Sequence, residues 1–413
     1  RRFLIGGSGL LAAGALGGGV WAWRRDGGLP HTDAGPTTST TSPTTSPRSG
    51  GAADEHVLVV VQLSGGNDAL NTLVPLDGRY YDARPSLAVA DGGLVAMTGT
   101  TAYGLHPAFA SWKSLLAAGQ IAALAGIGFE HPDRSHFVAL AEWWAGANDL
   151  PGDAGWLGRY LDATKAGHDS PLRAVALGGG TPALTAEHSV ATVVNDVSGF
   201  ALNAPRSADR ATLVRAWEGL LPSYGDAGDA VDTFHRLAVA STSPSGGGPV
   251  GKGGGGREGD LVELLAVAAA LVHDEPAVRV IQVMAGGFDT HAAQAATQIR
   301  LLTDLADGVA GFFSTLAGSG NAERVLLVTV SEFGRRVAEN GSGGTDHGKA
   351  GVQFVVGPAV KGGVYGRYDL GALDDGDLPA RVDPGSLYTL ALDWLGAPVE
   401  EILGRRFDTL GVV

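Results

Sequence analysis

The chain has 413 residues, of which 44% are hydrophobic and 17% charged, as in a globular protein with a large core. Its formal net charge of -14 argues against nucleic acid or an anionic membrane surface as the main partner. The absence of cysteine excludes disulfides, thiol catalysis and thiolate-metal sites. Any metal site must therefore be built from His, Asp and Glu.

The first 30 residues have the pattern of an export signal. Arg1 and Arg2 precede a Gly-rich apolar stretch that ends at Trp23, before two more arginines. Paired arginines at such a position resemble a twin-arginine signal, whose substrates usually fold before export. A buried N-terminal helix is the alternative, which the many glycines disfavour. We expect a twin-arginine signal or membrane anchor over residues 1–30, the twin-arginine export machinery as a partner, and an extracytoplasmic location.

Residues 3–23 are about long enough to span a bilayer, so cleavage and retention as a membrane anchor both stay open. Residues 31–55 are rich in Thr, Ser and Pro and are interpreted as a disordered linker. A second low-complexity stretch, 243–259, resembles a phosphate loop only superficially, because no Ser or Thr follows Lys252. It is interpreted as a flexible insertion in a domain over 56–413, and the surrounding region 201–259 as a partly mobile cap.

The folded part alternates between two patterns. Short, continuous apolar runs predict strands buried on both faces at Val57–Leu63, Ile121–Ile127, Leu172–Leu177, Val278–Met284, Val325–Val330 and Val352–Val356. Helical periodicity lies between them at Pro107–Ala118, His136–Ala145, Leu261–His273 and Ala292–Leu316. This alternation predicts an α/β fold, a doubly wound and mostly parallel sheet with helices on both faces.

Polar clusters follow the predicted strands, where sites gather in open α/β sheets. The side chains concerned are Asp68, Arg134, Ser135, His136, Asp289, His291, Glu332, Asp346 and His347. Each has a structural explanation when taken alone: Ser135 as a helix cap, Glu332 with Arg335 as an ion pair, and the others as turn or surface residues. Their convergence favours a metal or anion site, because carboxylate and imidazole groups bind divalent ions.

A series of motifs resembles the exported bacterial family catalogued as domain-of-unknown-function family 1501 (DUF1501). The motifs are Arg1-Arg2-Phe-Leu, Leu63-Ser-Gly-Gly-Asn-Asp-Ala-Leu-Asn, Tyr80-Tyr-x-x-Arg-Pro-Ser-Leu-Ala, Gly104-Leu-His-Pro-Ala, Arg134-Ser-His-Phe, Gly155-Trp-Leu-Gly-Arg-Tyr-Leu, Gly286-Gly-Phe-Asp-Thr-His, Ser331-Glu-Phe-Gly-Arg and Thr345-Asp-His-Gly. They run in order across almost the whole folded part. The family is in turn similar to the alkaline phosphatase superfamily, which implies an alkaline phosphatase-like sheet and one or two divalent ions (Zn, Mn or Ca).

The resemblance also implies roles. Ser135 stands at the nucleophile's position, with His136 and Arg134 as acid or anion clamp. The implied metal ligands are Asp68, Asp289, His291, Glu332, Asp346 and His347. Two departures matter: Ser331-Glu332 replaces the usual Asp-His pair of the second metal, and the sulfatase nucleophile motif is absent.

Two functions remain open on the sequence. The first is an exported metal-dependent hydrolase of an anionic ester, with a phosphoester as first choice and a small ester or a polymer as substrate. The second is a non-catalytic exported binding or assembly protein that retains the fold, which the altered second metal site favours.

Overall fold

A computed structural model describes residues 20–22, 56–146, 153–164, 170–195 and 260–413. The predicted signal or anchor (1–30), linker (31–55) and cap with its Gly-rich insertion (243–259) lie outside these ranges, apart from residues 20–22. Within the described ranges, no helix combines the length and the hydropathy needed to cross a bilayer.

The main sheet has nine strands in the order β1-β8-β7-β9-β2-β10-β11-β6-β12. Their bounds are β1 Val20–Ala22, β8 Thr192–Val194, β7 Ala174–Leu177, β9 Val280–Ala285, β2 Val57–Leu63, β10 Val325–Val330, β11 Gly351–Val356, β6 Ile121–Ile127 and β12 Gly363–Gly366. The strands from β8 to β10 pair in parallel, whereas β11 is antiparallel to both of its neighbours. The predicted α/β fold with a mostly parallel sheet is confirmed.

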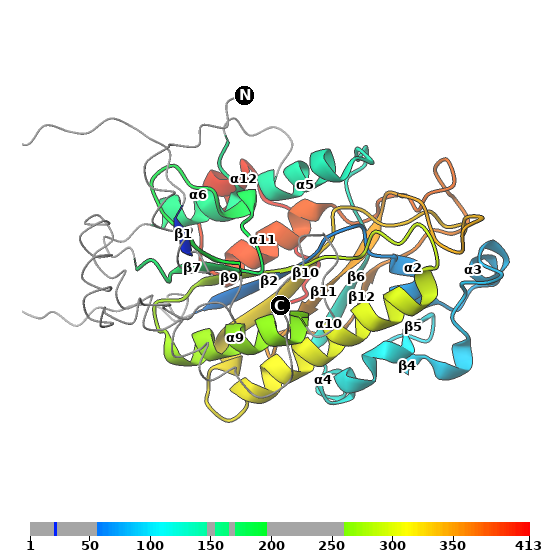
Figure 1. Ribbon diagram of the computed structural model, residues 1–413, viewed down its shortest axis with the longest axis horizontal. Coiled ribbons are helices and arrows are strands. Elements are labelled where there is room, and N and C mark those ends of the chain that lie inside the picture. The colour runs from blue at the N-terminus through cyan, green and yellow to red at the C-terminus, as the bar shows by residue number, and fades with distance from the viewer. Residues whose placement is uncertain (1–19, 23–55, 147–152, 165–169, 196–259) are drawn as a thin grey trace, which may run out of the picture.

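Helices cover both faces of this sheet (Figure 1). One face carries α9 (Asp260–Asp274), α10 (Gln294–Leu316), the 3-10 turn η3 (Pro107–Trp112) and α4 (Lys113–Ala117). The other carries α5 (His136–Ala145), α6 (Trp156–Ala163), α11 (Pro384–Trp394) and α12 (Val399–Leu403). A small second sheet joins β3 (Leu73–Pro75), β5 (Tyr103–Leu105) and β4 (Val95–Ala96), beside α2 (Ala69–Thr72) and α3 (Gly78–Ala83).

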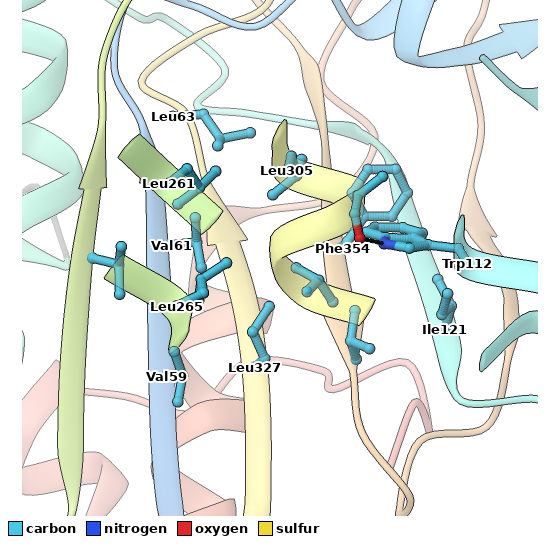
Figure 2. Packing of buried hydrophobic residues seen from close by; sticks show 14 of the residues in the cluster. Val59, Val61, Leu63, Trp112, Ile121, Leu261, Leu265, Leu305, Leu327 and Phe354 are labelled. Carbon is cyan, nitrogen blue, oxygen red and sulfur yellow. Dashed lines mark hydrogen bonds between the residues drawn. The ribbon is translucent and has the colours of Figure 1, made fainter. Parts of the chain in front are cut away.

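The central strand β2 shows how the sequence builds both layers. Its seven residues are all buried, and successive side chains point to opposite faces. Val59 and Val61 pack with Leu265 of α9 and Leu305 of α10 (Figure 2), while Leu58 and Val60 pack against the helices on the other face. A strand buried on both faces reads as a continuous apolar run, which is why its bounds could be predicted from the sequence.

The reversed direction of β11 determines which loops meet. Parallel strands β9, β2 and β10 place their carboxyl ends at one edge of the sheet, and β6, which is antiparallel to β11, runs the same way as β10. Because β11 runs against them, its amino end lies at that same edge. The segment 345–348, which precedes a strand, therefore joins the segments that follow β2, β9 and β10 and the start of α5.

Trp112 tests the packing of η3 against α10. Its side chain is fully buried, its ring contacts Phe354, and its indole N–H donates to the carbonyl oxygen of Ala306 at 3.0 Å (Figure 2). We expect Trp112→Ala to lower the free energy of unfolding by about 3–5 kcal/mol, measured by denaturant titration, because it leaves a cavity. Ile299→Ala, which removes a half-exposed side chain from α10, is the control and should change stability by less than about 0.5 kcal/mol. Equal effects of the two variants would contradict this account of the packing.

Candidate metal centre

Four side chains converge at the carboxyl edge of the sheet. Asp289 and His291 come from the segment after β9, His136 is the first residue of α5, and His347 precedes β11. The Oδ1 atom of Asp289 lies 3.0 Å from Nε2 of His291, 3.2 Å from Nε2 of His347 and 3.5 Å from Nε2 of His136. The two Nε2 atoms of His291 and His347 are 2.8 Å apart. One carboxylate oxygen and three imidazole nitrogens thus surround a single point.

Each of the three imidazole rings is oriented by a hydrogen bond at its Nδ1 atom, the ring nitrogen that does not face the cluster. The acceptor is Oε1 of Glu332 for His136, at 2.8 Å, and Oδ1 of Asp346 for His291, at 3.1 Å. For His347 it is the backbone carbonyl oxygen of Arg134, at 2.8 Å. Carboxylate and carbonyl oxygens only accept hydrogen bonds, so in the neutral imidazoles the proton sits on Nδ1 and a lone pair on Nε2. Oxygen acceptors behind the ring are the usual second layer of a histidine metal site.

The Nε2 lone pairs of His291 and His347 make this site suited to a cation. With both Nδ1 atoms protonated, the two Nε2 lone pairs across 2.8 Å repel unless a proton or a metal cation lies between them. Four ligands about 2.0 Å from an ion at the centre of a tetrahedron lie about 3.3 Å apart. The four distances here, 2.8 to 3.5 Å, bracket that value. His136, Asp289 and His347 therefore have the spacing of metal ligands, and His291 adjoins them through its contacts with Asp289 and His347.

Nearby charges prepare the ligands for this role. Partial burial alone would favour the neutral carboxyl of Asp289, but the hydrogen bond and the charge of Arg335, together with the contacts with His347 and His291, outweigh it and lower its pKa to about 2. Burial lowers the pKa of His347, and the charge of Arg335 adds to the effect. The carboxylate is thus ionised and the His347 imidazole neutral near pH 7, which are the forms that bind metals.

The guanidinium of Arg335 holds the surrounding segments together. It is buried and donates to the carbonyl oxygens of Gly65, Gly66, Phe288 and Thr345 and to Oδ1 of Asp289. These acceptors belong to the segments after β2 and β9 and before β11. One side chain therefore fixes the backbone around the cluster and also neutralises its carboxylate.

Gly65 allows two of these segments to approach closely. Its φ of +121° suits glycine, and a Cβ atom there would lie 2.3 Å from the backbone nitrogen of Asp289. Its N–H donates to Oε1 of Glu332 at 2.8 Å, the same oxygen that holds His136. The glycine therefore links the segment after β2 both to the ligand Asp289 and to the carboxylate behind a second ligand.

The structure brings most of the predicted site residues together, in two layers. Asp289 and His347 form the cluster together with His136, which was predicted as an acid or anion clamp, and His291 adjoins them through Asp289. Glu332 and Asp346 stand behind histidines. Glu332 is buried, and Arg335 pairs with Asp289 rather than with it.

Asp68 lies outside the cluster. Its carboxylate is buried in an ion pair with Arg84, which is itself fully buried, and also accepts a hydrogen bond from Gln294. An acidic residue that follows a buried strand was predicted to bind metal, but here it balances an arginine.

Ser135 and Arg134 sit beside the cluster. The hydroxyl of Ser135 is exposed and does not cap α5, although Ser135 occupies the N-cap position. Its two neighbours in the chain both contact the cluster, Arg134 through its carbonyl oxygen and His136 through its ring. The guanidinium of Arg134 forms an ion pair with buried Asp377, so the predicted anion clamp already has a partner.

Sequence reasoning missed the contributions of Arg335 and Asn340. Arg335 was weighed only as a partner of Glu332. The Nδ2 atom of Asn340 donates to the carbonyl oxygen of His291 and to Oδ1 of Asp346, which supports both a ligand and the carboxylate behind it. No pattern in the sequence marks Asn340, which lies in a Gly-rich turn.

A family model described as "Protein of unknown function (DUF1501)" matches residues 84–403. No curated protein matches the sequence. Solved structures similar to the chain include a protein in the alkaline phosphatase superfamily from Vibrio parahaemolyticus, with 8% identity, a TM-score of 0.39, and coverage of 83% of this chain and 67% of the other. Another is the phosphonate monoester hydrolase SpPMH from Silicibacter pomeroyi, with 10% identity, a TM-score of 0.38, and coverage of 84% of this chain and 74% of the other. A third is alkaline phosphatase from the Antarctic bacterium TAB5, with 10% identity, a TM-score of 0.36, and coverage of 82% of this chain and 98% of the other. Similarity at this level does not transfer an activity, so the chemistry of the site rests on its own residues.

The convergence of the four ligands predicts metal binding. We expect the purified chain to bind about one equivalent of Zn or Mn, measured by elemental analysis, and the double variant Asp289→Ala His347→Ala to bind none. The control removes the exposed pair His273 and Asp274, which also form a His–carboxylate contact, by His273→Ala Asp274→Ala. Equal metal content in both variants would contradict the assignment.

The position of Asp68 predicts a structural effect without metal loss. Asp68→Asn leaves the buried charge of Arg84 without its partner, so unfolding should become easier by roughly 3–5 kcal/mol in denaturant titration. The metal content of the folded variant should stay the same. Asp393→Asn, which removes an exposed pair with Arg406, is the control and should cost less than about 1 kcal/mol. A folded Asp68→Asn protein without its ion would instead place Asp68 among the ligands.

Proposed function

Since the chain belongs to the DUF1501 family, as its motifs predicted, we propose that it is a metal-dependent hydrolase of an anionic ester, with a phosphoester as first choice. The observation that carries this proposal is the convergence of three imidazole Nε2 atoms on Asp289, each ring anchored through Nδ1. Anchored rings cannot turn away, so the ligand atoms are in position before any ion arrives.

Zn or Mn suits this ligand set better than Ca. Three imidazole nitrogens and one carboxylate oxygen are typical of Zn and related transition ions, whereas Ca takes oxygen ligands almost exclusively. We propose one ion rather than two. Among the described residues, His136, Asp289 and His347 form the one group with metal-ligand spacing, which His291 adjoins. Oδ2 of Asp68 pairs with Arg84 and Oε1 of Glu332 with His136, while the second oxygen of each buried carboxylate has no hydrogen-bond partner.

The chain's own residues divide the work of the reaction. His136, Asp289, His291 and His347 hold the ion, which when bound draws charge from the ester oxygens. Ser135 would attack phosphorus: its Oγ–P bond forms as the bond to the leaving group breaks, and the hydroxyl proton passes to the departing alkoxide, which leaves as the alcohol. Water then attacks phosphorus, the Oγ–P bond breaks, and a proton of that water returns to Oγ, which releases phosphate. Support for this assignment comes from the exposed hydroxyl of Ser135, which makes no capping hydrogen bond and lies between two residues that contact the cluster.

A second candidate, a non-catalytic binding or assembly protein, is favoured by one observation. Asp68 and Glu332, the residues expected to hold a second ion, are both engaged elsewhere. Such a protein would keep the metal and bind an anion without turnover. For either function we propose an extracytoplasmic location, which Arg1-Arg2 and the apolar stretch after them support.

Ser135→Ala tests the nucleophile. We expect the rate of hydrolysis of 4-nitrophenyl phosphate or its diester, followed by absorbance, to fall at least about a thousandfold. The metal content and the unfolding midpoint should not change, because the side chain is exposed. Ser111→Ala, at an exposed serine in η3, is the control.

The outcomes separate the candidate functions. An unchanged rate in Ser135→Ala would assign the attack to water instead of the serine. A metal-loaded parent chain that binds phosphate but turns over neither ester would favour the binding protein.

A further inference from the structure

The outer surface of α5 is apolar beside the metal centre. Its ten residues include one charged side chain, Glu142. Phe137 is 87% exposed and Val138 43%, and no other large hydrophobic side chain of the described residues exceeds 49%. The helix uses Ala139 and Trp143 for packing, so Phe137 contributes little to the core. A phenyl ring left in water carries a free-energy cost that binding an apolar group would reduce.

The position of this surface connects it to the chemistry. Phe137 directly follows His136, whose ring contacts Glu332 and Asp289, and stands two residues from Ser135. All of them belong to the first turn of α5 or its N-cap. The turn that supplies a ligand and the proposed nucleophile therefore also supplies the most exposed aromatic ring among the described residues.

We propose that Phe137, together with Val138, forms a subsite for an apolar, ring-bearing group of the ester whose anionic part is held at the metal centre. This inference rests on the proposed function and names its substrate class: an ester that joins a charged group to an apolar ring. Phe137 takes the part of a specificity-determining residue, because ring-on-ring contact adds affinity for one class of substituent and none for the anion itself.

Binding of two non-hydrolysable probes to the metal-loaded chain tests the subsite by calorimetry. Phenylphosphonate and methylphosphonate share the anion and differ in the ring. We expect the phenyl compound to bind roughly two- to tenfold more tightly, the range of aromatic contacts. In Phe137→Ala this preference should disappear while the affinity for methylphosphonate stays the same, and Phe137→Leu should keep part of it.

Val413→Ala is the matched control. Val413 is a half-exposed apolar residue whose carbonyl oxygen accepts a hydrogen bond from Lys361. Lys361 lies just before β12, which starts beside the amino end of β6, so Val413 is at the end of the strands opposite to the metal centre. Its removal should leave the phenyl preference unchanged. Unfolding midpoints of both variants should match the parent chain, because both side chains are on the surface.

Each other outcome overturns the inference in a distinguishable way. If both probes bind and the preference survives Phe137→Ala, the subsite is refuted while the proposed function stands. If the ion is bound and neither probe binds, the proposed phosphoester function fails and the subsite with it. If the parent chain, but not Phe137→Ala, sediments with neutral phosphatidylcholine vesicles and shows no phenyl preference, the apolar turn is a membrane contact instead.

Discussion

The buried guanidinium of Arg335 donates hydrogen bonds to three segments that are far apart in the sequence. It joins the carbonyl oxygens of Gly65 and Gly66, of Phe288 and of Thr345, and it reaches Oδ1 of Asp289. A buried positive charge is costly unless its donors are satisfied, so the three segments must stay where they are for Arg335 to remain in place. The same constraint positions Asp289, His291 and His347, because each lies within two residues of an acceptor.

This arrangement separates charges that hold the fold from charges that serve the site. Arg84 with Asp68, and Arg134 with Asp377, are ion pairs in which the acid is buried and the partner is an arginine. Asp289 is different: it is half-exposed, and its carboxylate faces one guanidinium on one side and three imidazoles on the other. Arg335 offsets part of the carboxylate charge permanently.

Much of the fold followed from the sequence, and much of the site did not. The strands β2, β6 and β10 have the predicted bounds, because residues buried on both faces leave continuous apolar runs. The convergence of the segments was predictable from the rule that sites gather at strand ends. Whether a given side chain would line the cluster or support another residue that does so could not be predicted from the sequence. Glu332 and Asp289 follow β10 and β9, the two strands that flank β2, yet Glu332 supports a potential ligand and Asp289 is one.

The anchored histidines determine how the ion and the fold depend on each other. With both Nδ1 atoms protonated, the Nε2 lone pairs of His291 and His347 face each other, and their rings are kept there by Asp346 and by the carbonyl oxygen of Arg134. The fold therefore sustains a repulsion that a bound cation removes. An ion that binds only the folded chain stabilises it by an amount that grows with the logarithm of its concentration. The potential ligands come from the segment after β9, from α5 and from the segment before β11. Stabilisation by an ion would therefore apply to the contact between the central strands and α5, whose first turn and N-cap carry Phe137 and Ser135. An ion bound by His136 would thus also hold the first turn of α5, which carries the proposed nucleophile and subsite.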